Sequence, residues 1–254
     1  MGKGDKNVMV TGASGGVGQA VVQLFHEAGW YVIGVDRESF PASFPKNGLF
    51  IRADISQPDA FPGLFNQVNE FSSYLNVLIN NASVQITKPL LAMPVEEWDE
   101  VMASNLRTVF LAAKYAHPYL KKSGDGAIVN VSSVHAIATS SNIAAYAASK
   151  GGMLALTRAL AIEFAVDNIR VNAILPGAVD TQMLRAGLNR EHGAGISPED
   201  AIEALARKTV IGRVGTPQEI AKSIYFLSDS TQSSFMTGQA LVVDGGATAR
   251  LSTE

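Results

Sequence analysis

Short apolar runs alternate with longer segments of helical periodicity along most of the chain. The apolar runs predict strands at residues 7–11, 30–35, 49–52, 76–80, 127–131, 170–175 and 240–243. The periodic segments predict helices at residues 16–28, 59–72, 95–119, 144–164 and 217–227. In the first of them, Val17, Val21, Leu24 and Phe25 recur at i, i+4, i+7 and i+8, the spacing of one helix face.

This alternation predicts a doubly wound α/β domain of the Rossmann type. Strands that are apolar throughout and joined by helices are typical of a parallel sheet covered on both faces. No linker, repeat or low-complexity stretch divides the chain, so residues 1–254 are expected to form one domain. Residues 177–208 are more polar and contain Gly187, Gly193 and Gly195, which favours a substrate lid inserted in the fold.

Composition narrows the class of protein. The chain has 254 residues, of which 47% are hydrophobic and 17% charged, as in soluble globular proteins. It has no cysteine, which excludes disulfides, a thiolate nucleophile and cysteine-ligated zinc. Its formal net charge of -3 argues against a nucleic-acid partner. The polar start and the short apolar runs predict neither a signal peptide nor a membrane span, so the expected localisation is cytoplasmic.

A glycine-rich loop lies between the first strand and the first helix. It reads T-G-A-S-G-G-V-G over residues 11–18. Backbone N–H groups at a helix N-terminus bind pyrophosphate, and glycines at 12, 16 and 18 allow the turn and the close approach of a phosphate. The spacing G-x-x-x-G-x-G differs from the usual dinucleotide fingerprint, so the alternative is a glycine-rich turn without a ligand. Its position between strand and helix favours the nucleotide site.

Asp36 ends the second predicted strand, where an acid accepts hydrogen bonds from an adenosine ribose. The same carboxylate would repel a 2′-phosphate, which favours NAD over NADP. Arg37 follows it and could pair with a 2′-phosphate. NADP is therefore the less favoured alternative.

Tyr146 and Lys150 are four residues apart in a predicted helix and share one of its faces. A phenol with a pKa of about 10 is a poor base at neutral pH. A nearby ammonium lowers that pKa by favouring the phenolate. The spacing alone would equally be found in a tyrosine and a lysine on the protein surface that have no catalytic role. Polar residues that follow other strands, Asn81 and Ser133 among them, favour a site instead, because ligands of open α/β sheets bind at these strand ends.

Taken in order, these motifs resemble the short-chain dehydrogenase/reductase family over nearly the whole chain. The matching segments are Thr11-Gly12-x-x-x-Gly16-x-Gly18, Asp54-Ile55, Asn80-Asn81-Ala82, Asn105, Ser133, Tyr146-x-x-x-Lys150, Pro176-Gly177-x-x-x-Thr181 and Asp244-Gly245-Gly246. The resemblance implies an enzyme that transfers a hydride between a nicotinamide cofactor and a secondary alcohol or ketone. It implies no metal.

The resemblance also implies a role for each catalytic residue. Tyr146 is expected to be the general acid/base, and Lys150 to lower its pKa and hold the nicotinamide ribose. Ser133 is expected to bind the substrate oxygen, and it is preferred to Ser132 because the family's serine usually lies thirteen residues before the tyrosine. Asn105 is expected to hold a water that links Lys150 to solvent.

The implied cofactor contacts follow the nucleotide from end to end. Asp54 is expected at the adenine, Asn81 at the adenosine ribose, and Thr181 at the nicotinamide carboxamide, which Ile174 and Pro176 also approach. The full set is Gly12, Ser14, Gly15, Gly16, Val17, Gly18, Asp36, Arg37, Asp54, Ile55, Asn81, Ala82, Tyr146, Lys150, Pro176, Gly177, Val179 and Thr181.

One position departs from the family pattern. Ser83 follows Asn80-Asn81-Ala82, where the family often has glycine. Glycine tolerates a positive φ and serine does so poorly, which brings the local backbone into question. A serine hydroxyl there could also face the ligand.

The candidate substrate residues are Ser133, His135, Asn142 and Met183. His135 could contact a polar substrate or bond within its loop, and Asn142 could line the pocket or cap the Tyr146 helix. With Gln85 they favour a small hydroxylated substrate such as a sugar or sugar acid. An apolar wall for a steroid or acyl chain is the alternative, and its residues would be Val84, Ile86, Met183 and Leu184.

The predicted helices 95–119 and 144–164 are apolar on more than one face. In the family they form a dimer interface, so a homodimer or homotetramer is expected, the alternative being burial against the sheet alone. Two other functions remain open: an NADPH-dependent 3-oxoacyl-thioester or carbonyl reductase, and a non-catalytic nucleotide sensor. A serine hydrolase built on Ser133 and His135 is dismissed, since no G-x-S-x-G motif is present.

Overall fold

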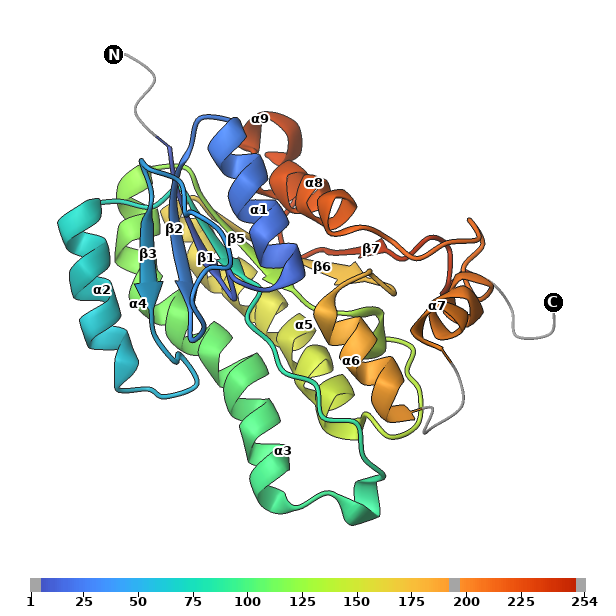
Figure 1. The fold of residues 1–254 in the computed structure, drawn as a ribbon. Coiled ribbons are helices and arrows are strands. Elements are labelled where there is room, and N and C mark those ends of the chain that lie inside the picture. The colour runs from blue at the N-terminus through green and yellow to red at the C-terminus, as the bar shows by residue number, and fades with distance from the viewer. Residues whose placement is uncertain (1–5, 192–196, 250–254) are drawn as a thin grey trace.

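A parallel sheet of seven strands forms the centre of the molecule (Figure 1), as seen in a computed structural model that describes residues 6–191 and 197–249. The strand order is β3-β2-β1-β4-β5-β6-β7, and every neighbouring pair is parallel. The strands are β1 Asn7–Thr11, β2 Tyr31–Asp36, β3 Leu49–Arg52, β4 Val77–Asn80, β5 Gly126–Val131, β6 Ile169–Pro176 and β7 Ala240–Val243. Each overlaps a predicted strand, so the predicted α/β class is confirmed.

Helices cover both faces of this sheet. Side chains of a strand alternate between the faces, so Val8 and Val10 of β1 pack on one side and Met9 on the other. The first face is covered by α1 Gly16–Glu27 and α8 Pro217–Ser228. The second is covered by α2 Ala60–Phe71, α4 Thr108–Ser123 and α5 Ala144–Phe164. Strands buried on both faces explain why the sequence shows unbroken apolar runs rather than alternation.

The strand order reverses direction between β1 and β4, which are neighbours in the sheet although two strands separate them in the chain. Crevices at such a switch point, outside the carboxyl ends of the strands, are where open α/β sheets bind ligands. The glycine loop follows β1, Asn81 follows β4, and Ser133 follows β5. The topology therefore brings the predicted site segments to one edge.

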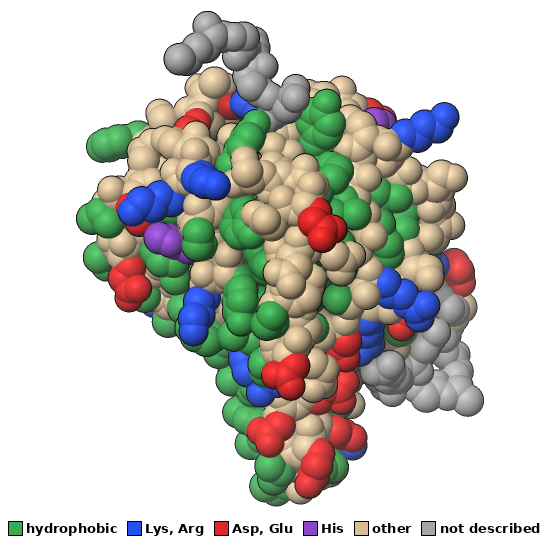
Figure 2. Space-filling view, turned by 90° about the vertical axis from the view of Figure 1, so that its left-hand side faces the viewer, with side chains coloured by type: hydrophobic (Ala, Val, Ile, Leu, Met, Phe, Trp, Pro, Cys, Tyr) green, Lys and Arg blue, Asp and Glu red, His purple; other side chains and the backbone are tan. Residues whose placement is uncertain are grey.

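The helix predicted for residues 95–119 is divided into three parts. These are α3 Val95–Met102, a π-helical turn η2 Ala103–Arg107 that contains Asn105, and α4, which Gly124 ends at a φ of 73°. At the bottom of Figure 1, α3 projects beyond the sheet, and acidic side chains gather on this projection in Figure 2. Hydrophobic periodicity does not mark this turn, because it reports which residues are apolar and not which backbone hydrogen bonds form.

The predicted lid segment contains two helices, α6 Gln182–Glu191 and α7 Pro198–Ala206. The Ser197 hydroxyl caps α7 by accepting from Asp200 N. Gly193 and Gly195 lie outside the described residues. The short elements are η1 Leu90–Ala92, η3 Val134–Ala136, η4 Ala165–Asp167 and α9 Ser230–Ser233.

Within residues 6–191 and 197–249, no helix is both long and apolar enough to cross a bilayer. Cytoplasmic localisation stays a prediction from the sequence.

Candidate active site

The glycine loop needs glycine at two of its positions for steric reasons. Gly12 has a φ of 65°, and a Cβ there would lie 2.7 Å from the Ala82 Cα. A Cβ on Gly18 would lie 2.1 Å from the Gly12 carbonyl oxygen. Gly15 is the N-cap of α1 and has no side chain to cap the helix. The first-turn N–H groups thus have no side-chain partner and can receive an anion.

Asn81 attaches the end of β4 to this loop. Its Nδ2 donates to the Thr11 and Gly12 carbonyl oxygens at 3.2 and 2.9 Å. The Thr11 Oγ1 in turn accepts from the backbone N–H groups of Asn81 and Ala82. Asn81 therefore positions the phosphate loop, and its predicted contact with the adenosine ribose stays a prediction.

The Asp36 carboxylate lies against the glycine loop. Its Oδ2 accepts from Ser14 N at 2.9 Å and its Oδ1 from Glu38 N at 3.0 Å. These bonds hold the acid at the end of β2, where a ribose was expected. The Arg37 side chain is more than half exposed, and its Nε lies 4.0 Å from a Glu38 carboxylate oxygen. Such an exposed pair is weak, which leaves Arg37 free to move.

Two further predicted adenine-side residues follow β3. Asp54 uses Oδ1 to accept from Ser56 N at 3.0 Å, and Ile55 is buried in the core on the α2 face. These residues fit the adenosine diphosphate half of a nicotinamide dinucleotide. The loop excludes side chains at Gly12 and Gly18, the N-terminus of α1 has no side-chain cap, and an acid stands at the end of β2.

The predicted nicotinamide segment returns to the same loop. Gly177 N donates to the Val243 carbonyl at 3.0 Å, and a Cβ on Gly177 would lie 2.8 Å from the Asp244 Cα. Gly177 therefore packs against the end of β7 and the Asp244-Gly245-Gly246 segment that follows it. Val179 bridges to Gly215. A Cβ on Gly16 would lie 2.9 Å from the Thr181 Cγ2, which places Thr181 directly beside the phosphate loop.

Tyr146 and Lys150 project from α5 toward the end of β5, and both are buried. The Lys150 Nζ lies 5.4 Å from the centre of the Tyr146 ring and donates to the Val131 carbonyl at 2.8 Å. The Ser133 hydroxyl is among the groups that act to lower the pKa of the Tyr146 phenol. Ser132 instead donates to the Lys150 carbonyl at 3.0 Å and anchors the helix. This difference supports the preference for Ser133.

Burial dominates the protonation of this pair. It lowers the pKa of Lys150 to about 7 and raises the pKa of Tyr146 above its ordinary value. The hydroxyls of Ser133 and Ser83 act against burial and lower the pKa of Tyr146, but Lys150 does not do so. The predicted lowering of the Tyr146 pKa by Lys150 is therefore wrong for the ligand-free protein. Loss of water around two buried groups outweighs their attraction.

Asn105 ties the segment after β4 to the helix that carries Tyr146. Its Oδ1 accepts from Val84 N at 2.8 Å, and its Nδ2 donates to the Val84 carbonyl at 2.9 Å and to the Ser149 Oγ at 3.1 Å. The Ser149 hydroxyl donates to the Tyr146 carbonyl at 2.7 Å. Both amide hydrogens of Asn105 are thus used within the protein. Its predicted contact with a water stays a prediction. Such a water would have to donate to the Asn105 Oδ1, since no amide hydrogen is left.

Ser83 adopts an ordinary backbone conformation. Among the described non-glycine residues, only Asn142 and Asn168 have a positive φ. The concern that serine fits this position poorly is therefore not borne out. Its hydroxyl oxygen is buried and has no hydrogen-bond partner that meets ordinary geometry.

His135 lies beside Tyr146, with the two rings edge to face and their centres 6.0 Å apart. Its N–H donates to the Ser133 Oγ at 3.2 Å, and its Nδ1 lies 3.3 Å from the Thr139 Oγ1. The sequence offered two alternatives for His135, a position in the site and a hydrogen bond within its own loop. The structure shows the residue both beside Tyr146 and bonded within its loop. The His135 side chain is thus held next to Tyr146.

Asn142 does not cap the Tyr146 helix. The N-cap is Ile143, which makes no side-chain cap bond, so that alternative was wrong. Asn142 has a φ of 65°, and its carbonyl accepts from Lys88 N at 2.6 Å. Asparagine tolerates the left-handed region, so a turn explains the residue. Met183 lies half-exposed on α6, and its substrate role stays a prediction.

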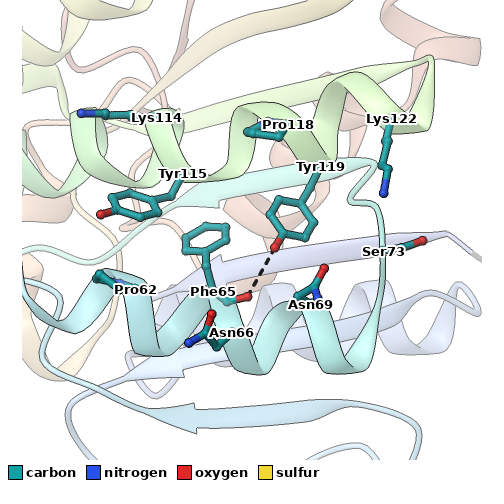
Figure 3. A pocket seen from close by; sticks show the side chains of 10 residues that line it. All are labelled: Pro62, Phe65, Asn66, Asn69, Ser73, Lys114, Tyr115, Pro118, Tyr119 and Lys122. Carbon is teal, nitrogen blue, oxygen red and sulfur yellow. Dashed lines mark hydrogen bonds between the residues drawn. The ribbon is translucent and has the colours of Figure 1, made fainter.

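A separate groove of about 740 Å³ lies between α2 and α4 (Figure 3). Aromatic rings form its floor, with Phe65 stacked on Tyr115 at 5.5 Å and Tyr119 donating to the Phe65 carbonyl. None of the predicted site residues lines it. No set of three or more metal-binding side chains occurs in the part of the chain that the structure describes.

Sequence reasoning missed Thr11 and Ser149 as positioning residues. Thr11 opens the glycine motif, but its hydroxyl acts on residues 79–82, about 70 positions further along the chain. Ser149 binds the Asn105 amide, 44 residues away, and no local pattern marks it.

Known proteins resemble the chain over almost its full length. A family model described as enoyl-(acyl carrier protein) reductase matches residues 12–248. The 3-oxoacyl-[acyl-carrier-protein] reductase FabG of Thermotoga maritima is 35% identical, over 95% of this chain and 97% of that protein. The ligand-free structure of Thermoplasma acidophilum aldohexose dehydrogenase superposes with a TM-score of 0.92 at 33% identity, covering 98% and 96% of the two chains. The structure of ElxO with NADP bound gives 0.85 at 25% identity, covering 97% of this chain and all of that one.

Proposed function

Because the chain belongs to the short-chain dehydrogenase/reductase family, we propose that it oxidises a small hydroxylated secondary alcohol, such as a sugar or sugar acid, with NAD. Family membership makes it an oxidoreductase that acts on CH–OH groups with a nicotinamide dinucleotide. The observation that carries the proposed chemistry is the buried Tyr146 phenol, with the Lys150 Nζ 5.4 Å from the centre of its ring and the Ser133 hydroxyl among the groups that lower its pKa.

In this proposal Tyr146 is the base for alcohol oxidation. Its phenolate takes the proton from the substrate hydroxyl while the carbonyl double bond forms, and Ser133 holds the substrate oxygen by a hydrogen bond. A nicotinamide held at this edge of the sheet would supply the acceptor for the hydride that leaves the same carbon. The Asn105–Ser149 contacts hold α5 against the segment after β4. This keeps the proton-transfer geometry rigid.

The preference for NAD rests on Asp36. Its carboxylate is held by Ser14 N at the edge of the glycine loop, so a 2′-phosphate brought to this position meets a fixed negative charge. Arg37 is the observation that favours the alternative, an NADPH-dependent 3-oxoacyl-thioester or carbonyl reductase, since its exposed guanidinium can turn toward a phosphate.

The substrate class rests on the polar groups around Tyr146. His135 lies beside the phenol, and its ring offers a hydrogen bond to a second hydroxyl of the substrate, in addition to the bond from Ser133 to the reacting oxygen. An aldohexose is the substrate named for one similar structure, which supports a polyhydroxylated ligand here. The residues of α6 and α7 are proposed to close over this ligand as a lid.

We further propose a homodimer or homotetramer built on α4 and α5. Phe110 of α4 and Ile162 of α5 are 48% and 77% exposed, and Val166, just beyond α5, is 86% exposed. Apolar side chains in such numbers on neighbouring helices are stabilised by a partner surface.

The deciding experiment has two stages. The purified protein is first titrated with NADH and NADPH by the fluorescence of the reduced nicotinamide. Sugars, sugar acids, steroids, short secondary alcohols and acyl thioesters are then offered as substrates with both cofactors. Tighter binding of NADH and turnover of a polyol or sugar acid are expected. A preference for NADPH together with reduction of an acyl thioester would replace the proposal with its alternative.

A further inference from the structure

The predicted nicotinamide segment, residues 176–181, is paired with a part of the chain that carries none of the predicted site residues. The connection between α7 and α8 runs beside this segment (Figure 1). Gly215 N donates to the Ala178 carbonyl at 2.8 Å, and the Gly215 carbonyl accepts from Asp180 N at 2.9 Å. These two bonds flank the bridge between Val179 and Gly215. The backbone position of residues 178–180 therefore depends on where Gly215 is fixed.

A carboxylate in the first turn of α8 fixes Gly215. Glu219 pairs with Arg213 through two bonds, from Nη1 to Oε2 at 2.9 Å and from Nη2 to Oε1 at 2.6 Å. The Glu219 Oε2 also accepts from the N–H and the hydroxyl of Thr216 at 2.9 and 3.1 Å. The Thr216 hydroxyl in turn caps α8 by accepting from Glu219 N. One carboxylate thus binds the chain on both sides of Gly215, and we call Arg213, Thr216 and Glu219 the clamp.

The geometry of the clamp makes it stronger than an ordinary surface ion pair. The Arg213 and Glu219 side chains are 52% and 40% exposed, and exposed pairs are generally weak. A guanidinium that donates two bonds to one carboxylate is the exception, because the planar groups match each other. The Arg213 guanidinium and the Thr216 N–H lower the pKa of the Glu219 carboxyl to about 2, so the pair stays charged throughout the neutral pH range.

The backbone of Arg213 is anchored independently of its side chain. The buried Thr209 hydroxyl donates to the Arg213 carbonyl at 2.9 Å and accepts from Arg213 N at 3.1 Å. Between these two residues, Ile211 N donates to the Gly245 carbonyl at 3.2 Å. Substitution of the Arg213 side chain therefore removes the clamp and leaves the bonds that shape this turn in place.

We propose that Arg213 and Glu219 are positioning residues for the nicotinamide half of the cofactor, an inference that rests on the cofactor site of the proposed function. The clamp fixes Gly215, Gly215 fixes residues 178–180, and these set the place of Thr181 beside the phosphate loop. The adenosine diphosphate half is left to the glycine loop and the end of β2. Loss of the clamp therefore weakens the hold on the nicotinamide and spares the rest of the dinucleotide.

The test compares NADH with ADP-ribose, which lacks the nicotinamide ring, by calorimetric titration well below Tm. Arg213→Met is expected to raise the Kd of NADH about fivefold, the full strength of such a pair, and to leave the Kd of ADP-ribose unchanged. Glu219→Gln keeps an acceptor for the Thr216 N–H but loses the charge, and the same selective loss is expected. Arg213→Lys keeps the charge without the two-bond contact and is expected to fall between Arg213→Met and the parent.

Two further variants serve as controls. The Lys121 Nζ lies 2.7 Å from the Asp167 Oδ1, and this ion pair precedes β5 and β6 at the edge of the sheet opposite to the site. Lys121→Met is therefore expected to change neither Kd. Thr181→Val alters the predicted nicotinamide segment directly and is expected to weaken NADH alone. Equal weakening of both ligands in Arg213→Met would show a merely structural pair and overturn the proposal, as would unchanged binding of both or a Thr181→Val variant without selective loss.

Failure of the proposed function is distinguishable from failure of the clamp. Turnover of a substrate is not needed for these titrations, so a panel without a hit leaves them valid. If the parent binds NADPH more tightly than NADH, the preference for NAD fails, and the same variants are then titrated with NADPH and 2′-phospho-ADP-ribose. A selective loss of NADPH in Arg213→Met would support the clamp, and an equal loss of both ligands would overturn it.

Discussion

Asn105→Ala separates two accounts of this residue. In the structure its side chain makes three hydrogen bonds, two to the Val84 backbone and one to Ser149, and it is wholly buried. The family resemblance assigns it instead to a water near Lys150. A residue that only holds a water affects turnover, whereas a buried clamp between two segments also contributes to the stability of the fold.

The magnitude follows from those contacts. Each buried hydrogen bond contributes about 1 kcal/mol net, and polar groups left unpaired cost somewhat more. Loss of all three bonds is therefore expected to lower the free energy of unfolding by about 3 kcal/mol. In a protein of this size, such a loss lowers Tm by roughly 6 to 12 °C. Ser149→Ala removes two hydrogen bonds, the one from Asn105 and its own to the Tyr146 carbonyl, and is expected to lower Tm by about two thirds as much.

The assay is thermal denaturation followed by circular dichroism, without cofactor, for the parent, both single variants and the double variant. The two losses are expected to be non-additive, because Asn105 and Ser149 share a bond. A Tm for Asn105→Ala close to that of the parent would refute the clamp. Activity lost without any loss of stability would then favour the water-holding role.

The remaining predictions concern chemistry, cofactor choice and pH. Tyr146→Phe is expected to abolish turnover while NADH affinity, measured by fluorescence titration, stays within a few fold, and retained turnover would remove the proposed base. Asp36→Asn is expected to shift the ratio of NADH to NADPH affinity toward NADPH, since it removes the fixed negative charge beside Ser14; an unchanged ratio would mean that another group selects the cofactor. Burial lowers the pKa of Lys150 to about 7, below its unfolded value, so between about pH 7 and pH 9.5 the unfolded chain binds more protons at this residue. The Tm of the ligand-free parent is therefore expected to rise across that range relative to Lys150→Met, and parallel curves would contradict a buried, mostly neutral lysine.

Local pattern was enough to predict the architecture. Each of the seven strands is a short apolar run, and each major helix carries an apolar stripe or a broadly apolar surface, because neighbouring layers bury these residues. Elements whose form depends on distant partners were missed. The π turn at Asn105 coincides with bonds to Val84, which lies 21 residues away. Helix α6 is short and polar, and α7 is only nine residues long.

The site divides in the same way. Ordered motifs identified Ser133, Tyr146 and Lys150, since a four-residue helical spacing and a strand end are visible in the chain. Only the tertiary structure decided what surrounds them: the Asn81 amide on the phosphate loop, the Asp36 carboxylate on Ser14, and the Asn105 amide between Val84 and Ser149.

The raised pKa of Tyr146 shows most clearly what can be read from the sequence and what depends on the tertiary structure. The sequence by itself determined that a tyrosine and a lysine share a helix face, which predicts attraction between a phenolate and an ammonium. How much water remains around the two groups depends on the packing of β5, α5 and the segment after β4, and that packing buries both. The type of each residue and the spacing between residues are therefore visible in the sequence. Burial depends on distant segments that pack together, and so does the balance between desolvation and attraction.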